Sequence, residues 1–308
     1  MDRLELSEYS SALGLELVSL EIIQENKYCV IYLGNTNSGK CIVKKYRGED
    51  PALVRIEAEA LAFYHELAKD DELLIDSRSP ILNEEKNILC IGFVEGERFS
   101  DFICSARRDP ALQAKAFHHM RTLGKLLRTI YEQTKQPKKE TDPLIFEYFD
   151  YSSRRLEENK WFGSAFFKGY QKSAEKISDK FRQEKITPSF VHGDLVFKNI
   201  HVNEKRLGLI DFANAIYLSH PLNDIYNLKI ALANMVLKKR FKSELMSNFF
   251  QGFGSVEFPE IAHEFYFEYQ RRRWLMLKLS WFHVKEWLQG FRALATFAKP
   301  YRNKVQPL

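Results

Sequence analysis

Two features that would point to a membrane or secreted protein are missing from this sequence. No apolar run approaches the roughly 18 residues that a membrane-spanning helix needs. The first ten residues contain Asp2, Glu5 and Glu8 where a secretory signal would carry bases, and no apolar segment follows them. Because 45% of the 308 residues are nonetheless hydrophobic, large cores can form. We therefore expect a soluble, cytoplasmic, folded protein.

Cysteine is scarce, and its spacing excludes the usual cysteine-based sites. The four cysteines, Cys29, Cys41, Cys90 and Cys104, form no Cys-x-x-Cys pair, and no cysteine–histidine cluster has the spacing of a zinc site. Each lies in or beside an apolar run, which indicates reduced thiols rather than a disulfide framework.

The chain has only a small excess of positive charge, but this excess lies in the C-terminal third. The net charge is +5, and the residues from Pro221 onward contain 14 Lys and Arg against 7 Asp and Glu, a local charge of +7. The preceding 220 residues hold 32 basic and 34 acidic residues, which gives −2. The basic C-terminal third suits an anionic substrate, a peripheral membrane-surface contact or an ordinary solvated face, and we expect no nucleic-acid partner.

The order of apolar patterns predicts two domains of different composition. Short β-branched or aromatic runs predict four strands, at residues 27–34, 41–46, 80–83 and 87–94. Between the two pairs, apolar residues at helical spacing predict a helix over residues 51–68. From residue 100 onward the pattern is mostly helical. The sequence thus predicts an α+β fold, with a small antiparallel sheet and one helix in residues 1–97 and a larger helical domain in residues 98–308.

Three polar residues flank strands predicted within the segment 191–215. Asp194 follows a β-type run in a His-Gly-Asp turn, Asn199 lies five positions later, and Asp211 ends another apolar run. Turn-forming residues between the last two strands predict a hairpin, which would bring the three side chains to one end. Two carboxylates and an amide suit phosphoryl transfer, in which one carboxylate accepts a hydroxyl proton and the other groups hold Mg²⁺. Taken singly, each residue would be explained as a strand-end or turn residue.

The motif HGDLVFKN resembles the catalytic loop HGDxxxxN of the aminoglycoside phosphotransferase and choline kinase-like families, which are relatives of the protein kinases. The following LIDFANA resembles the metal-binding segment of those families. His-Gly-Asp replaces the His-Arg-Asp of protein kinases, Ala213 stands where they have glycine, and Val196 replaces the lysine of serine/threonine kinases. The resemblance implies a small-molecule kinase with a bilobal protein kinase-like fold.

The resemblance also implies a lysine that holds the nucleotide phosphates and a glutamate that pairs with it. Lys44 and Lys45 both lie on a predicted strand, and they point to opposite faces of it. The family pattern favours Lys44, with Glu57 of the predicted helix as its partner and Glu59 as an alternative.

The resemblance places a hinge after the fourth predicted strand, where the backbone of Phe93, Val94 and Glu95 would contact the adenine. One departure concerns the loop that covers the phosphates in protein kinases. Residues 22–28, where this loop is expected, contain no glycine.

Three further features admit more than one interpretation. Residues 34–41, GNTNSGKC, nearly match the phosphate-binding loop G-x4-G-K-[ST], but Cys41 offers no hydroxyl and the segment joins two strands, so we interpret it as a hairpin turn. The basic, aromatic residues 269–287 suit a membrane or an anionic substrate, although their helical spacing favours a core helix. Asp224 resembles an aspartate that buttresses the catalytic loop in these families, and it also suits a helix N-terminus.

Together, these patterns predict an ATP-dependent phosphotransferase that uses Mg²⁺ to phosphorylate a hydroxyl of a small molecule or of a glycoconjugate sugar. Asp194 would act as the base, Asn199 and Asp211 would bind the metal, and Lys44, fixed by Glu57, would hold the nucleotide. The basic C-terminal third favours an anionic acceptor over a polycationic aminoglycoside. The alternative is a non-catalytic pseudokinase that binds a nucleotide or a partner.

Overall fold

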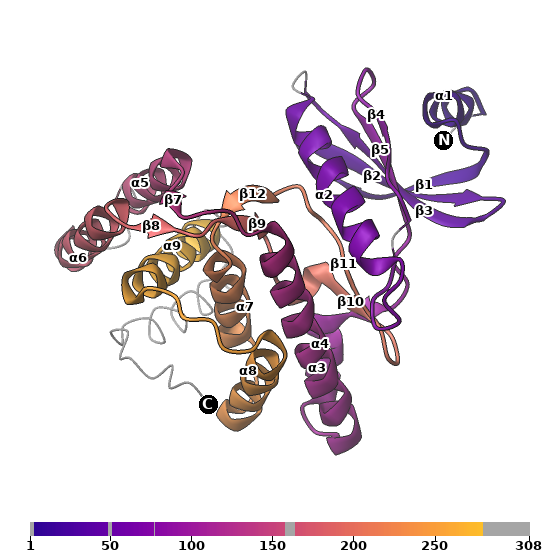
Figure 1. Ribbon diagram of the computed structural model, residues 1–308. Coiled ribbons are helices and arrows are strands. Elements are labelled where there is room, and N and C mark those ends of the chain that lie inside the picture. The colour runs from indigo at the N-terminus through magenta and orange to yellow at the C-terminus, as the bar shows by residue number, and fades with distance from the viewer. Residues whose placement is uncertain (1–2, 49–50, 77, 158–163, 280–308) are drawn as a thin grey trace. The chain divides into compact units, whose positions relative to one another are not determined.

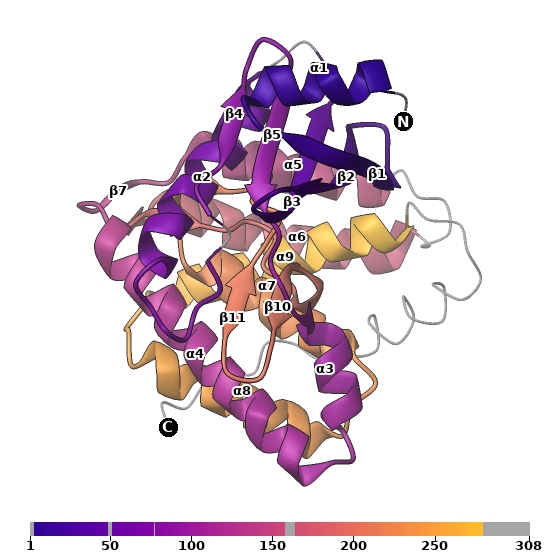
Figure 2. The ribbon, with the colours of Figure 1, turned by 90° about the vertical axis from the view of Figure 1, so that its right-hand side faces the viewer.

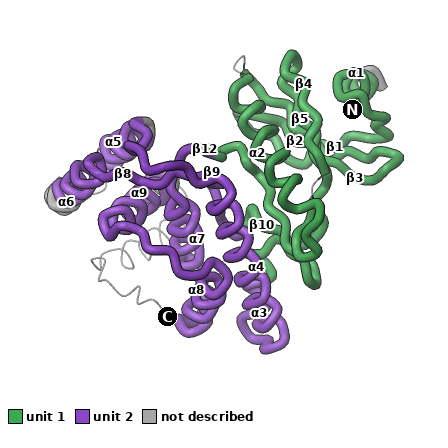
Figure 3. The backbone as a smooth tube through the Cα atoms, viewed as in Figure 1, with its two compact units in different colours: residues 1–102, 198–215 green, residues 103–197, 216–308 purple. Residues whose placement is uncertain are grey.

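The computed structural model of the protein describes residues 3–48, 51–76, 78–157 and 164–279, which form two compact units (Figure 1). The first unit extends to Phe102 and also contains Lys198–Ala215. The second contains Ile103–Phe197 and the described residues from Ile216 onward (Figure 3). The predicted domains 1–97 and 98–308 are each continuous in sequence, and this division remains a prediction. The first compact unit, in contrast, consists of two separate segments of the chain.

The first unit is built on a five-stranded antiparallel sheet with the strand order β1-β2-β3-β5-β4. Its strands are β1 (Leu17–Glu25), β2 (Cys29–Thr36), β3 (Gly39–Tyr46), β4 (Ile81–Asn83) and β5 (Ile88–Gly92). The four predicted strands are thereby confirmed as β2 to β5. Thr36 pairs with Gly39 across the turn between β2 and β3, so the segment that nearly matched a phosphate-binding loop is a hairpin turn.

Two helices lie against this sheet. The predicted helix is confirmed as α2 (Ala52–Ala68), which contacts β4 and β5, and an additional helix, α1 (Arg3–Leu13), packs across β1, β4 and β5 (Figure 2). Successive residues of β3 point to opposite faces of the sheet. Val43 therefore joins the core beneath α1, while Lys44 faces α2.

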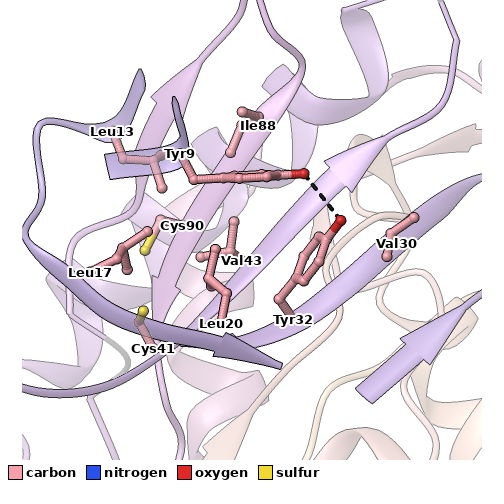
Figure 4. Packing of buried hydrophobic residues seen from close by; sticks show 10 residues of the cluster. All are labelled: Tyr9, Leu13, Leu17, Leu20, Val30, Tyr32, Cys41, Val43, Ile88 and Cys90. Atoms are coloured by element: carbon pink, nitrogen blue, oxygen red, sulfur yellow. Dashed lines mark hydrogen bonds between the residues drawn. The ribbon is translucent and has the colours of Figure 1, made fainter. Parts of the chain in front are cut away.

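The core of the first unit fills the space between α1 and the sheet (Figure 4). Tyr9 of α1 donates its hydroxyl hydrogen to the Tyr32 hydroxyl of β2 at 3.1 Å, which satisfies a polar group inside this core. Full burial stabilises each large apolar side chain by roughly 1.5–3 kcal/mol. The buried members are Tyr9, Leu13, Leu17, Leu20, Val30, Tyr32, Cys41, Val43, Ile88 and Cys90.

A β-hairpin from much later in the chain completes the first unit. Its strands, β10 (Ile200–Val202) and β11 (Leu207–Leu209), form a small sheet with β6 (Glu97–Arg98) in the order β11-β10-β6. The amide of Leu207 donates to the Leu73 carbonyl at 2.9 Å, so the hairpin is bonded to the segment after α2. The predicted hairpin is thus confirmed, and it carries the 3₁₀ turn η1 (Phe197–Asn199) at its start.

The second unit is mainly helical, as predicted. Its helices are α4 (Pro110–Thr134), α5 (Pro143–Glu157), α6 (Ser164–Arg182), α7 (Leu222–Asn234), α8 (Lys239–Phe253) and α9 (Glu260–Leu279), and α3 (Phe99–Ala106) leads into it. Two short antiparallel pairs complete the unit, β9 (Ser189–Val191) with β12 (Ile216–Ser219) and β7 (Lys139–Glu140) with β8 (Lys185–Ile186). No helix in the described residues is long and apolar enough to cross a membrane.

Helix α9 is a core helix of this unit up to Met276. It packs against α5, α6 and α7, and the ring of Phe265 stacks on that of Phe181 with centroids 4.2 Å apart. Arg271 and Arg272 are 8% and 1% exposed, so they present no basic face to a membrane. The core interpretation of the segment 269–287 is confirmed up to Met276, and the side chains of the rest of it lie outside what the structure describes.

Helix α7 contains a half-buried lysine with aromatic neighbours. The Nζ of Lys229 lies 4.8 Å from the ring centroid of Tyr226 and 5.2 Å from that of Phe250. Burial lowers the pKa of Lys229 to about 8, because an ammonium loses hydration in this environment.

Candidate active site

A buried ion pair links the sheet of the first unit to α2. The Nζ of Lys44 is 2.6 Å from Oε1 of Glu57, and the side chains are 8% and 0% exposed. Lys45 lies on the opposite face of β3 and donates to the Lys86 carbonyl. The other candidate partner, Glu59, is exposed on α2. The sequence left Glu57 and Glu59 open, and the structure pairs Lys44 with Glu57.

The same ammonium also faces a carboxylate after β11. Oδ1 of Asp211 lies 3.4 Å from the Nζ of Lys44, and the Asp211 side chain is 42% exposed. Burial disfavours the ammonium of Lys44, but the carboxylates of Glu57 and Asp211 outweigh this effect and raise its pKa above the ordinary value. Lys44 is therefore a fixed positive charge between one fully buried and one solvent-facing carboxylate.

Asp211 adopts an unusual backbone conformation. Its φ is +66°, in the left-handed region that few residues other than glycine occupy. Such a conformation costs of order 1–3 kcal/mol and persists where the surroundings hold it, which is common at functional sites.

Tyr46 is a part of this cluster that the sequence analysis missed. It lies two residues after Lys44 on β3, so both side chains are on the α2 face, and its hydroxyl donates to the carboxylate of Glu57. Burial, with the negative charge of Glu57 in second place, raises the pKa of Tyr46. The i, i+2 spacing from Lys44 was the signal that could have identified it.

Asn199 and Asp211 flank the open end of the β10–β11 hairpin. Ile200 pairs with Leu209, and the carbonyl of Asn199 accepts from the Ile210 amide at 3.0 Å. Asn199 is 4% exposed, and both residues offer oxygen ligands of the kind that Mg²⁺ prefers. The described residues contain no group of three or more His, Cys, Asp or Glu that could hold a metal ion. The oxygen donors of Asn199 and Asp211 fit Mg²⁺, which is commonly bound by one or two carboxylates together with substrate phosphates.

The predicted hinge residues follow β5 and precede β6. The Phe93 amide donates to the Lys40 carbonyl at 3.3 Å, Val94 is 4% exposed, and Glu95 is exposed. Nothing in this geometry tests their proposed contact with adenine, which remains a prediction.

Asp194 lies in the second unit, in the loop after β9. The loop is held by Asp224 of α7, whose carboxylate accepts from the His192 amide at 2.7 Å and from the Gly193 amide at 3.0 Å. Burial raises the pKa of Asp224, while His192 and these amides oppose the rise. Gly193 has a φ of +77°, which side-chain-bearing residues rarely adopt. Asp224 therefore buttresses the loop from its position in the first turn of α7.

A second contact to this loop was not predicted. Arg273 of α9 donates to the Gly193 carbonyl at 2.5 Å and to Oδ1 of Asp194 at 3.1 Å. The sequence analysis treated Arg273 as one of a run of basic residues, because nothing in its spacing connects it to a position 79 residues earlier.

The predicted site residues thus divide between the two units. Lys44, Glu57 and Asp211 are in contact in the first unit, and Asn199 is bonded through its backbone to the residue before Asp211. Asp194 belongs to the second unit, so its convergence with the metal-binding candidates remains a prediction.

Comparison with solved structures shows the fold. A spectinomycin phosphotransferase in complex with ADP and spectinomycin is 16% identical, with a TM-score of 0.57 over 97% of this chain and 95% of its own. An amicoumacin kinase in complex with AMP-PNP and Ca²⁺ is 14% identical, with a TM-score of 0.62 and the same coverage. A choline kinase from Streptococcus pneumoniae is 17% identical, with a TM-score of 0.60 over 96% of this chain and 99% of its own. The predicted kinase-like fold is confirmed.

Comparison at the level of sequence gives the family. No curated protein sequence matches the chain significantly. The family model described as the phosphotransferase enzyme family matches residues 25–275, which include Lys44, the segment from Asp194 to Asp211 and α9 up to Leu275. The expected resemblance to aminoglycoside phosphotransferases and choline kinases is confirmed by this match and by the three structures. The chain therefore belongs to the phosphotransferase enzyme family.

Proposed function

We propose that this phosphotransferase transfers the γ-phosphoryl group of ATP to a hydroxyl of a small molecule or of a glycoconjugate sugar, in the presence of Mg²⁺. The observation that carries the proposal is the position of the Lys44 ammonium between Glu57 and Asp211. A structural ion pair would need only one carboxylate, whereas the half-exposed Asp211 remains accessible to a ligand. The adenine nucleotides in the spectinomycin phosphotransferase and the amicoumacin kinase support ATP as the donor.

Each residue has a defined part in this reaction. Lys44 binds the nucleotide phosphates, Glu57 fixes its position, and Asn199 and Asp211 would hold Mg²⁺, which neutralises phosphate charge when bound. Asp194 orients the acceptor hydroxyl and accepts its proton. The acceptor oxygen then forms a bond to the γ-phosphorus as the bond to the ADP oxygen breaks. Because such transition states are loose, positioning and charge neutralisation supply nearly all of the rate.

We further propose that the acceptor is anionic, such as a sugar phosphate, and that the reaction takes place in the cytoplasm. The support is the local charge of +7 from Pro221 onward, which would repel a polycationic aminoglycoside. A panel of anionic, neutral and cationic acceptors in an ATP-consumption assay tests this. Turnover restricted to polycationic antibiotics would contradict the anionic acceptor.

The proposed donor site has a matched pair of variants for its test. Lys44→Met should abolish ATP binding by isothermal titration, whereas Lys45→Met should leave it intact, because Lys45 points away from Glu57 and Asp211. Asp194→Asn should retain ATP binding and lose turnover by roughly 10²–10⁴-fold. Nucleotide binding without turnover on any acceptor would instead favour the pseudokinase.

A further inference from the structure

Arg273 makes a two-pronged contact with the loop that contains Asp194. One guanidinium nitrogen, Nη1, donates to the Gly193 carbonyl, and the other, Nη2, donates to Oδ1 of Asp194. The side chains of Arg273 and Asp194 are 16% and 20% exposed, so water competes little for this pair. A planar guanidinium that bonds a backbone oxygen and a carboxylate at once restricts both the loop and the side-chain torsions of Asp194.

The loop itself lacks a cation at the position where serine/threonine kinases carry a lysine. That position, two residues after Asp194, is occupied by Val196. The positive charge beside Asp194 comes instead from α9, an element that the chain reaches only after α7 and α8.

The surroundings of Arg273 hold its guanidinium in place. The three successive arginines of α9 point in different directions, since residues on a helix are about 100° apart. Arg271 pairs with Glu268 of the same helix at 2.9 Å. Arg272 donates to Ser153 of α5, and its guanidinium carbon lies 4.5 Å from the ring centroid of Phe149. With its two neighbours anchored in this way, α9 presents Arg273 to the loop from a fixed helix.

A tyrosine of α5 packs against a tyrosine of α9, four residues before Arg273. The rings of Tyr148 and Tyr269 have centroids 5.5 Å apart. Burial raises the pKa of Tyr148, and the positive charge of Arg273 opposes the rise.

A carboxylate and a guanidinium bind the backbone of this loop at the same residue, Gly193. Asp224 of α7 accepts from the Gly193 amide, and Arg273 of α9 donates to the Gly193 carbonyl. Because Gly193 has a φ of +77° and no side chain to restrict its backbone, these contacts define an orientation that the residue alone would not keep.

We propose that Arg273 is a positioning residue, which fixes the orientation of the Asp194 carboxylate toward the acceptor hydroxyl. The inference rests on the proposed function, since it assigns Asp194 the role of base. Where catalysis depends on positioning, a carboxylate displaced by about 1 Å loses on the order of 100-fold in rate. Arg273 thus supplies from α9 the restraint that the catalytic loop does not supply itself.

The test compares Arg273→Ala and Arg273→Lys with the matched control Arg240→Ala, whose side chain is 89% exposed on α8. The assay measures the hydrolysis of Mg-ATP, with water as the acceptor, from the rate at which ADP is formed. We expect Arg273→Ala to lower kcat by roughly 100-fold with the KM for ATP unchanged, since Arg273 makes no proposed contact with the nucleotide. Arg273→Lys should lie between Arg273→Ala and the wild type. Arg240→Ala should match the wild type.

Guanidinium rescue separates positioning from a merely structural role. Millimolar guanidinium should restore part of the rate of Arg273→Ala and none of that of Asp194→Asn. Wild-type kcat in Arg273→Ala, or a loss without rescue in that variant, overturns the positioning role. If Arg273→Ala does not fold, wild-type kcat in Arg273→Lys overturns the role, because a single ammonium lacks the planar fork of two nitrogens that restrains Gly193 and Asp194 together. A wild-type protein that binds no Mg-ATP, or that binds it without turnover on water or on any acceptor of the panel, overturns the proposed function, whereas in a wild-type enzyme that turns over the Arg273 variants decide this inference.

Discussion

Because Lys44 pairs with Glu57 and not with Glu59, replacing Glu57 should destabilise the protein more than replacing Glu59. Glu57 is fully buried and accepts from both Lys44 and Tyr46, whereas Glu59 is exposed on the same helix. Removing one partner of a buried pair typically costs about 3–5 kcal/mol, because the remaining charge stays buried without compensation. Asp211 remains 3.4 Å from Lys44 and compensates part of this, so we expect Glu57→Ala to lose about 2–3 kcal/mol of unfolding free energy.

Urea unfolding measures this difference directly. Glu59→Ala is the matched control, and its unfolding free energy should stay within about 0.5 kcal/mol of the wild type. Glu57→Gln keeps a hydrogen-bond acceptor and loses the charge, so it should fall between the two alanine variants. Equal midpoints for Glu57→Ala and Glu59→Ala, with unchanged slopes, would refute the assignment of Glu57 as the buried partner of Lys44.

Three further predictions concern single positions. Lys229 has a pKa of about 8 in the folded protein against 10.5 in the unfolded chain, so the folded protein binds this proton more weakly. Lys229 therefore lowers the unfolding free energy by its full amount below pH 8, and this loss disappears as the pH rises toward 10.5. Lys229→Met should therefore raise the unfolding free energy at pH 7 by up to roughly 3 kcal/mol and remove this rise with pH, measured by urea unfolding across that range. Gly193→Ala should lower kcat and cost about 1–2 kcal/mol, because its φ is +77°; a wild-type rate would count against the required loop geometry. Asp211→Asn should raise the Mg²⁺ concentration needed for half-maximal turnover, and an unchanged requirement would remove Asp211 from the metal site.

Local patterns predicted much of the first unit and the core character of α9. The strands β2 to β5 were recognisable because their β-branched and aromatic runs are bounded by turn-forming residues. Helix α1 was missed because its sequence, RLELSEYSSAL, contains three serines, which favour caps and turns over helix interiors. The opposed directions of Lys44 and Lys45 followed from strand alternation alone.

The missing parts were long-range contacts. No local pattern indicates that the hairpin after Asn199 bonds to Leu73, or that Arg273 reaches Asp194, because both contacts depend on how the chain returns to an earlier element. The pairing of Lys44 with Glu57 rather than Glu59 likewise depends on the rotation of α2 about its axis, which the sequence left open between two glutamates.

The interrupted first unit affects the order in which the protein can fold during synthesis. Its β6 strand has no partner until β10 emerges from the ribosome, and the Leu73 carbonyl lacks the Leu207 amide until then. The intervening stretch of about a hundred residues takes the ribosome roughly 5–20 s to translate. During that delay β6 and the segment after α2 remain without the hairpin that bonds to them, so nascent-chain proteolysis should show protection of these two segments only after Ala215 has emerged from the ribosome.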